Sequence, residues 1–313
     1  MDALIFIDTN IFLDFYRIRG REAGLSILER VDEHREMIVT SDQVEMEYKK
    51  NRPTVILETH KQLQKPDSGG VQLPPIVAES KASKAIERDQ KRIKAQADTV
   101  RTRLKAVLSS PTRYDPVYKV LQRLFRSRGP YNLSREKDVR LEIRELAEKR
   151  FLLGYPPRKM DDTSCGDAIN WEWIIWCAKA SGKDIVIATR DSDYGVSFDG
   201  PVLNDWLAEE FKSRVSRKRR LVLTDRLSDA FKRASVPVTK QEEKAEADLL
   251  ESVSAPGTSA LTYSVLQSAL QNLGWLELAS TARSRIVHPG FTVSDLGGLL
   301  SHIPDKEESK EDK

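Results

Sequence analysis

Two short apolar runs, each followed closely by acids, constrain the fold more than any other feature of this sequence. Ala3–Ile7 (ALIFI) leads directly into Asp8, and Asp184–Ala188 (DIVIA) leads into Asp191 and Asp193. Neither run shows the polar alternation of a half-exposed strand, so both are predicted to be strands buried on two faces. Such strands are typical of parallel sheets covered by helices. The sequence therefore predicts an α/β fold in which acids follow strands.

The segments between these runs indicate the same architecture. Met37–Val39 is predicted to be another buried strand, and the apolar spacing over Gly24–Val31 predicts a helix before it. Thr40-Ser41-Asp42-Gln43 resembles a capping box and predicts the start of a further helix. A strong helix over "TSCGDAINWEWIIWCAKA", a strand in "RRLVLTD" and a helix at Leu227–Ala234 follow later. Alternating strands and helices predict a parallel sheet flanked by helices.

The chain is predicted to contain an α/β domain over residues 1–236, interrupted by a helical, basic insertion at about 66–150. Two charged helical stretches, 79–108 and 134–151, form either a helical hairpin or a solvated pair of surface helices. Residues 237–260 are predicted to be a linker. Residues 261–303 are predicted to form a small, mainly helical or winged-helix-like module for nucleic acid or a protein partner, or else a packing appendage. Residues 304–313 are predicted to be a disordered acidic tail.

The insertion carries most of the positive charge. The whole chain has a net charge of +3, whereas residues 79–150 hold 20 Lys/Arg against 10 Asp/Glu, a surplus of +10. A basic surplus of this kind favours a polyanionic partner such as nucleic acid. The predicted phosphate contacts are Arg88, Lys91, Arg92 and Lys94. The alternative interpretation is a solvated helix face.

Acids occur at four places that a parallel sheet would bring to one edge, because ligands bind outside the carboxyl ends of such strands. They are Asp8, Glu45 with Glu47, Asp167, and Asp191 with Asp193. Two unit charges about 4 Å apart repel by about 4 kcal/mol at an effective dielectric near 20. A hard divalent cation with oxygen ligands removes that cost. The four histidines lie elsewhere in the sequence, so the set favours Mg²⁺ or Mn²⁺ over zinc.

Each acid also has a purely structural interpretation. Asp8 suits an N-cap. Asp167 suits a capping box begun by Ser164. Asp191 and Asp193 suit an Asx turn. Glu45 and Glu47 lie at similar angles to a buried face formed by Val44 and Tyr48, so helical geometry leaves the choice between them open.

The order of four motifs, "FIDTNIFLD", "DQVEMEYKKNR", "GDAINWEW" and "ATRDSDYG", resembles the PIN domain, a metal-dependent nuclease fold. The resemblance covers about residues 3–65 and 150–235, and is closest to PIN-like proteins with a charged helical insertion. It implies that four metal ligands, Asp8, Glu47, Asp167 and Asp191, act with Asp193 as the catalytic set. The family's V-x-x-E spacing selects Glu47. It also places Asn10 and Thr189 in supporting positions. Glu172 is either a further supporting acid or part of a solvated helix face.

The resemblance implies a Mg²⁺- or Mn²⁺-dependent nuclease, with RNA favoured over DNA. An endoribonuclease of this kind would serve as a toxin, in phage defence or in RNA processing. The alternative is an inactive nucleic-acid-binding protein on a PIN scaffold, because a fold does not guarantee its activity. A haloacid-dehalogenase-like phosphatase is disfavoured because it needs D-x-D where this chain has Asp8-Thr9-Asn10.

The remaining expectations concern setting and partners. No run approaches the about 20 apolar residues of a membrane span. Cys165 and Cys177 form no C-x-x-C motif, which favours a reducing, cytoplasmic setting. An inhibitory or effector protein and self-association are compatible with such a nuclease.

Overall fold

The central strands of the protein are β1 (Ala3–Ile7) and β4 (Asp184–Ala188), which are buried along their whole lengths. The computed structural model describes residues 2–18, 21–63, 76, 80–157, 164–198 and 200–254. These residues belong to a unit that extends to Ser254. The modules predicted at 261–303 and 304–313 lie outside the described residues.

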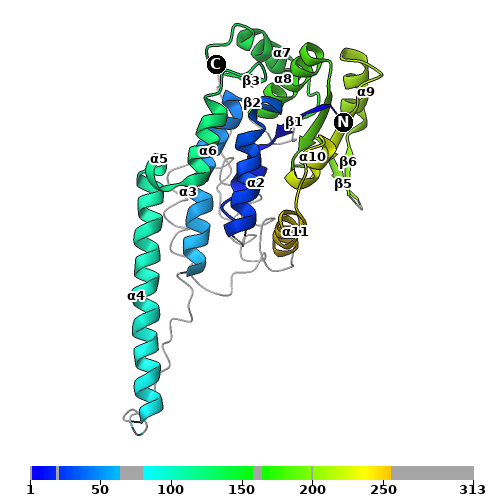
Figure 1. The fold of residues 1–313 in the computed structure, drawn as a ribbon. Helices are drawn as coiled ribbons and strands as arrows, with labels where there is room; N and C mark the ends of the chain where they lie inside the picture. The colour runs from blue at the N-terminus through cyan, green and yellow to red at the C-terminus, as the bar shows by residue number, and fades with distance from the viewer. Residues whose placement is uncertain are drawn as a thin grey trace, which may run out of the picture. The chain divides into compact units, whose positions relative to one another are not determined.

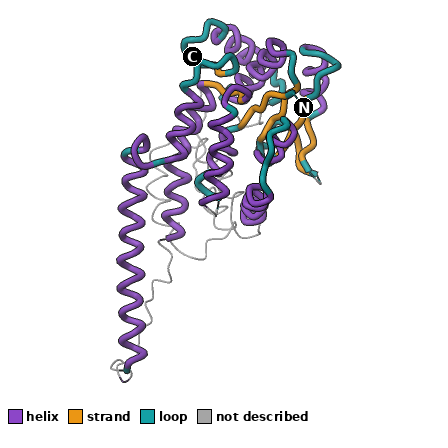
Figure 2. Tube along the Cα trace, in the orientation of Figure 1, coloured by secondary structure: helices purple, strands orange, loops and turns teal. Residues whose placement is uncertain are grey.

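The described residues form one parallel sheet, in the order β3-β2-β1-β4-β7 (Figures 1 and 2). Its other strands are β2 (Ile38–Ser41), β3 (Asn132–Leu133) and β7 (Leu221–Thr224). In the register, Phe6 lies beside Val39 on one side and Ile187 on the other. All the neighbouring strands are parallel, so their carboxyl ends meet at one edge. The predicted α/β fold with helices flanking a parallel sheet is confirmed.

Helices fill the connections between the strands. They are α1 (Thr9–Asp14), α2 (Arg21–Glu33), α3 (Asp42–Leu63), α4 (Lys81–Ser109), α5 (Pro111–Tyr114), α6 (Pro116–Phe125), α7 (Arg140–Leu152), α8 (Gly166–Ser181), α9 (Asp205–Arg214), α10 (Leu227–Arg233) and α11 (Lys240–Ser254). A 3-10 turn, η1 (Arg35–Met37), precedes β2. A separate antiparallel hairpin joins β5 (Gly195–Ser197) to β6 (Pro201–Leu203). Among the described residues, no helix combines the length and apolarity that crossing a membrane requires.

Of the two arrangements expected for the charged helices of the insertion, a hairpin or a pair of surface helices, the described residues do not show the hairpin. In the described residues, α4 packs against α3, whereas α7 packs against α8. Between them, β3 joins the edge of the main sheet beside β2. A buried ion pair connects the insertion to α3: Arg52 lies 2.6 Å from Asp115, the N-cap of α6. Strand β3 was not predicted, because two residues carry too little periodicity to be recognised in a sequence.

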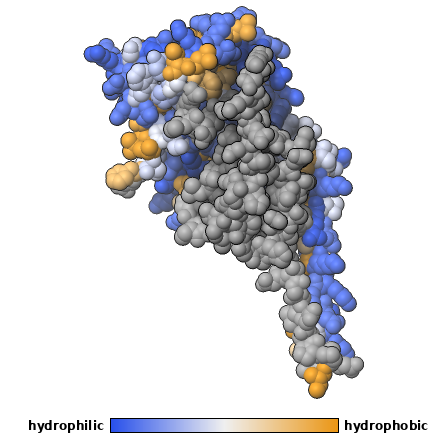
Figure 3. Space-filling model, turned by 180° about the vertical axis from the view of Figure 1, so that it is seen from behind, coloured by the Kyte–Doolittle hydropathy of each residue, from blue (hydrophilic) through white to orange (hydrophobic). Residues whose placement is uncertain are grey.

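Helix α4 is the part of the insertion that stands apart from the sheet. It extends past the end of α3 in Figure 1, and Figure 3 shows its exposed length as mostly hydrophilic. The cations Arg88, Lys91, Arg92 and Lys94 are all exposed on it. Arg92 makes an ion pair with Asp89 at 3.2 Å. The structure therefore places the predicted phosphate contacts on a solvent-facing helix, far from the carboxyl edge of the sheet.

Part of the predicted linker is folded. Helix α11 packs against α2 and α10. Its Glu242 is buried and accepts hydrogen bonds from Ser26, from Arg30 Nε at 2.8 Å and from the Thr239 backbone N–H at 2.6 Å. Its Glu246 accepts the backbone N–H groups of Leu227 and Ser228, which begin α10. Two acids of this predicted linker segment therefore make specific contacts with the folded unit.

Candidate active site at the carboxyl edge of the sheet

Asp8 lies where β1 ends, and it is also the N-cap of α1. One of its carboxylate oxygens accepts the Thr9 backbone N–H at 2.6 Å. The other accepts Asn10 Nδ2 at 2.8 Å and the Thr189 hydroxyl at 2.5 Å. The capping interpretation and placement at the carboxyl edge are therefore both true of Asp8, since the end of a strand and the start of the next helix share this residue.

Thr189 connects Asp8 to the second acidic loop. Besides donating to Asp8, its hydroxyl accepts the backbone N–H of Asp191 at 2.9 Å and Asn10 Nδ2 at 3.2 Å. The predicted supporting residues Asn10 and Thr189 thus lie between the ends of β1 and β4. Asp191 is partly buried in this loop, and Asp193 is buried.

Glu47 reaches the same edge from the second turn of α3. Its carboxylate accepts the Thr9 hydroxyl at 2.9 Å and Gln43 Nε2 at 2.7 Å. A Cβ at Gly166 would lie only 2.6 Å from Glu47 Oε1, so α8 begins directly against this carboxylate. Glu45 instead makes an ion pair with Lys49 at 2.6 Å on the surface. Tertiary packing thus brings Glu47, and not Glu45, to the acidic edge.

Asp167 enters the site from the first turn of α8. The N-cap of this helix is Cys165, which makes no side-chain capping hydrogen bond, and not Ser164 as the capping-box interpretation expected. Burial raises the pKa of Asp167 to about 9. Four further carboxylates raise that pKa as well: Asp8, Asp193, Glu47 and Asp191. The structure therefore brings together all five acids of the predicted catalytic set.

The same crowding acts on Asp8. Burial is the main cause that raises its pKa to about 7, and the charges of Asp191 and Glu47 add to it. The hydrogen bond from Thr189 works in the opposite direction, because it stabilises the ionised form. At neutral pH the edge therefore holds more carboxylates than it can keep ionised without a counter-charge.

Glu172 lies on α8 but does not join the acidic edge. It is buried and makes ion pairs with Arg150 at 2.8 Å and with Arg214 at 2.5 Å. Both expectations for Glu172, a supporting acid and a solvated helix face, therefore differ from what the structure shows. Its place is a charged network that connects α7, α8 and α9.

Sequence reasoning missed Arg190 and Tyr194 in this region. Arg190 makes an ion pair with Asp14 and lies within electrostatic range of Asp8. Tyr194 is buried, and burial together with the nearby acids raises the pKa of its hydroxyl. Both residues stand within the acidic motif "ATRDSDYG", but a single cation or tyrosine carries no spacing signal of its own.

The five carboxylates suit a divalent cation in their chemistry. Oxygen ligands and a concentrated negative charge are what Mg²⁺ and Mn²⁺ require. Within the described part of the chain, no group of three His, Cys, Asp or Glu side chains is arranged to hold an ion as it stands. Asp8 and Glu47 instead accept hydrogen bonds from neighbouring side chains.

An open parallel sheet with acids gathered at its carboxyl edge defines the class of protein: an α/β protein with a polar site where the strands end. The chain belongs to the PIN domain family, because a family model described as PIN domain matches residues 5–194. This match confirms the resemblance seen in the sequence. No curated protein and no solved structure gave a significant match. PIN domains have a nuclease-type fold, and they typically bind nucleic acid and use divalent metal ions.

Proposed function

We propose that this protein is a Mg²⁺- or Mn²⁺-dependent nuclease, and specifically an endoribonuclease. The observation that carries the proposal is the convergence of five acids from separate segments, where burial and mutual repulsion raise the pKa of Asp167 to about 9. In a structural ion-pair network the pKa of an acid is lowered. For Glu172, burial raises the pKa, but the hydrogen bonds and charges of Arg214 and Arg150 outweigh burial and lower it. The acids at the edge are instead left in need of a cation.

In this proposal Asp8, Glu47, Asp167 and Asp191 hold the cation and Asp193 supports them. The cation would neutralise charge on the phosphodiester and make the attacking water more acidic. The other groups position the ligands. Thr189 fixes Asp8 relative to the Asp191 loop, and Thr9 fixes Glu47. Asp167, with its raised pKa, keeps its proton at neutral pH until a cation displaces it.

The basic insertion would bind the phosphate backbone away from the chemistry. Arg88, Lys91, Arg92 and Lys94 are exposed on α4, a helix that extends past the end of α3 (Figure 1). RNA is the favoured substrate, and the cellular role would be that of a toxin, a defence nuclease or an RNA-processing enzyme in the cytoplasm. An inhibitory or effector protein, or a second copy of the chain, would be compatible with this activity.

A cleavage assay tests the proposal. Labelled transfer RNA, messenger-like RNA and single- and double-stranded DNA are incubated with the full chain in Mg²⁺, Mn²⁺ or EDTA. Cleavage of RNA that needs Mg²⁺ or Mn²⁺ is the expected result. Binding without cleavage in every metal condition would instead favour an inactive nucleic-acid-binding protein on the same scaffold.

A further inference from the structure

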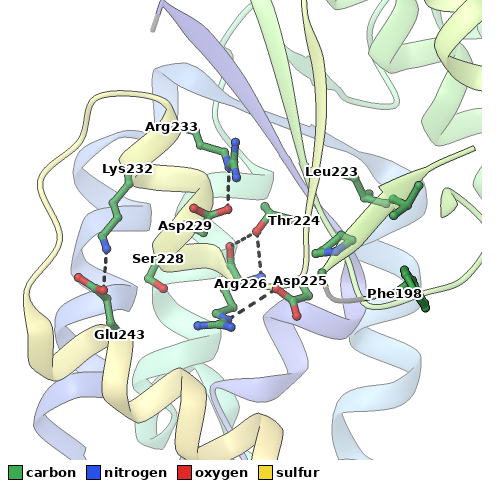
Figure 4. Close-up of a pocket in the computed structure, with 13 residues that line it drawn as sticks. Phe198, Leu223, Thr224, Asp225, Arg226, Ser228, Asp229, Lys232, Arg233 and Glu243 are labelled. Carbon is green, nitrogen blue, oxygen red and sulfur yellow. Dashed lines mark hydrogen bonds and ion pairs between the residues drawn. The ribbon is translucent and has the colours of Figure 1, made fainter. Parts of the chain in front are cut away.

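A pocket lies beside the acidic edge, between the β5–β6 hairpin and the segment that joins β7 to α10 (Figure 4). Its cavity volume is about 450 Å³, within the range of small-molecule sites. The hairpin contributes Phe198 and Val202. The opposite wall contributes Thr224, Asp225, Arg226 and Ser228. None of these residues belongs to the acidic set described above.

The pocket and the acids share the carboxyl edge of the sheet. Thr224 ends β7, and its carbonyl oxygen accepts the backbone N–H of Thr189 at 2.9 Å. Thr189 in turn donates to Asp8. Arg190 lies within electrostatic range of both Asp8 and Asp225. When one unit of a polymer is bound at the acids, the next unit of that polymer is therefore within reach of the pocket.

The lining of the pocket is mostly polar and charged, and one aromatic residue, Phe198, stands at its rim. The Phe198 side chain is 82% exposed, so one aromatic ring stands open to solvent at the rim. Arg226 is 47% exposed, and its Nε lies 3.7 Å from Asp225, a longer separation than in the neighbouring ion pairs of Lys232 and Arg233. A ring beside hydrogen-bonding groups and a cation suits an aromatic, polar-edged ligand attached to a phosphate.

Each wall of the pocket is anchored to the rest of the domain at one point. A Cβ at Gly195 would lie 2.1 Å from the Val202 carbonyl oxygen and 2.8 Å from Leu223, so the hairpin packs closely on itself and on β7. On the other wall, Glu246 of α11 accepts the backbone N–H groups of Leu227 and Ser228 at 2.9 and 2.8 Å. Such anchoring reduces the conformational entropy that a pocket loses when it binds.

We propose that this pocket binds the unstacked base of the nucleotide next to the scissile phosphate. The inference rests on the proposed nuclease function, because only that function makes the phosphate at the acids the scissile one. A base inside a duplex is stacked and paired, so it cannot enter a pocket of this kind without being extruded. Single strands and loops present their bases freely.

The test is a binding experiment that does not depend on cleavage. The full chain with Asp8→Asn, kept in EDTA, is titrated with a fluorescein-labelled single-stranded RNA and with the same sequence as a duplex. Phe198→Ala is added to this background. Val196→Ala is the matched control, because Val196 is 62% exposed on the same hairpin but does not line the pocket. Phe198→Ala should weaken single-strand binding about five- to a hundredfold, and Val196→Ala should leave it within about twofold.

Abasic substitutions locate the base. A set of single strands, each lacking one base, is titrated against the Asp8→Asn protein with and without Phe198→Ala. At one position the missing base should weaken binding when Phe198 is present and have no effect in Phe198→Ala. Equal effects of Phe198→Ala on strand and duplex would overturn the inference, and so would the absence of any coupled position. An affinity that Phe198→Ala leaves unchanged would overturn the inference as well.

The outcome is separable from that of the nuclease proposal. Phe198-dependent binding of single strands, without metal-dependent cleavage by the wild type, would support the pocket and contradict the nuclease. Metal-dependent cleavage of strands and duplexes at equal rates, unaffected by Phe198→Ala, would support the nuclease proposal and contradict the proposed base pocket.

Discussion

Asp167 is a partly buried acid in the first turn of α8, on which four other carboxylates act. When folding raises the pKa of an acid, the folded state still holds the proton at pH values where the unfolded chain has already lost it. The folded state therefore becomes less stable as the pH rises between the two pKa values. For Asp167 this loss begins near its ordinary pKa of 3.8 and continues up to about 9. Burial is the largest cause of the raised pKa, and a bound cation would offset the further part that comes from repulsion by the other carboxylates.

Asp167→Asn, and likewise Asp8→Asn, should reduce cleavage at least about 100-fold, the size of effect seen when one electrostatic group is lost from an active site. In EDTA, Asp167→Asn should have a higher Tm than the wild type, and the difference should grow between pH 4 and pH 9. Thermal melts across pH, with and without Mg²⁺, measure the stability effect, and the cleavage assay measures the loss of activity. A variant that cleaves at the wild-type rate would show that these acids are not the site.

Glu47 and Glu45 form a matched pair on one helix. Glu47→Gln should lower kcat/KM about 10–100-fold or more, because Glu47 faces the other acids and its oxygens are positioned by Thr9 and Gln43. Glu45→Gln should change it less than about twofold, because Glu45 only pairs with Lys49 on the surface. Steady-state kinetics on one RNA substrate gives the comparison. Equal losses in both variants would contradict the assignment of Glu47.

At the scale of elements, α11 is held to the sheet domain mainly by two acids on its inner face. Glu242 bonds to α2, and Glu246 bonds to the start of α10. The contacts from Arg30, Ser26 and Thr239 lower the pKa of Glu242 to about 2, although burial opposes them. Because its folded pKa is depressed, Glu242 stabilises the fold fully above its ordinary pKa of 4.5. That stability is lost as pH falls from 4.5 through about 2.

Glu242→Gln should therefore lower the free energy of unfolding by about 1–3 kcal/mol at pH 7 and by much less at pH 2.5. The adjacent Glu243→Gln is the control, because Glu243 pairs with Lys232 at the surface and should contribute less than about 1 kcal/mol. Urea unfolding at both pH values is the measurement. A loss for Glu242→Gln that does not depend on pH would show that packing, and not the ion pair, holds α11.

At the scale of the whole molecule, the structure separates a cationic helix from an anionic edge. The exposed cations of α4 extend past the end of α3, whereas the acids gather where the strands end (Figure 1). In the proposed function this separation divides substrate capture from chemistry. It also keeps the lysines and arginines of α4 from neutralising the acids that would bind a cation.

Reversing Arg88, Lys91, Arg92 and Lys94 to Glu should weaken RNA binding and reduce the salt slope by about 0.7–0.9 for each phosphate that the variant no longer neutralises. Single-turnover cleavage at saturating RNA should stay within about threefold of wild type, because the acidic edge is untouched. Reversal of Arg217, Lys218 and Arg219, which are exposed elsewhere, is the control. Unchanged affinity and slope in the α4 variant would show that its cations form only a solvated face.

The sequence alone determined the sheet and the positions of most acids along it. Five consecutive residues without polar alternation can be accommodated only between two covered faces, so β1 and β4 were predicted with their observed bounds. Since parallel strands end at one edge, Asp8 and Asp191 were expected at the same edge. The pairing of β1 with β4 in the structure then places them near each other. Two features were not predicted: β3, which is too short to show a period, and the buried face of α11, which lies among many charged residues.

Only the tertiary structure decided between residues whose positions in the local geometry are equivalent. Glu45 and Glu47 lie at similar angles on α3, and the contact with Gly166 of α8 brings Glu47 to the edge. Glu172 has the sequence context of a site acid, yet Arg150 and Arg214 bind it within a separate network. The periodicity of a sequence reports which face of an element is buried. Which partner meets that face depends on segments far away along the chain, and only folding brings them together.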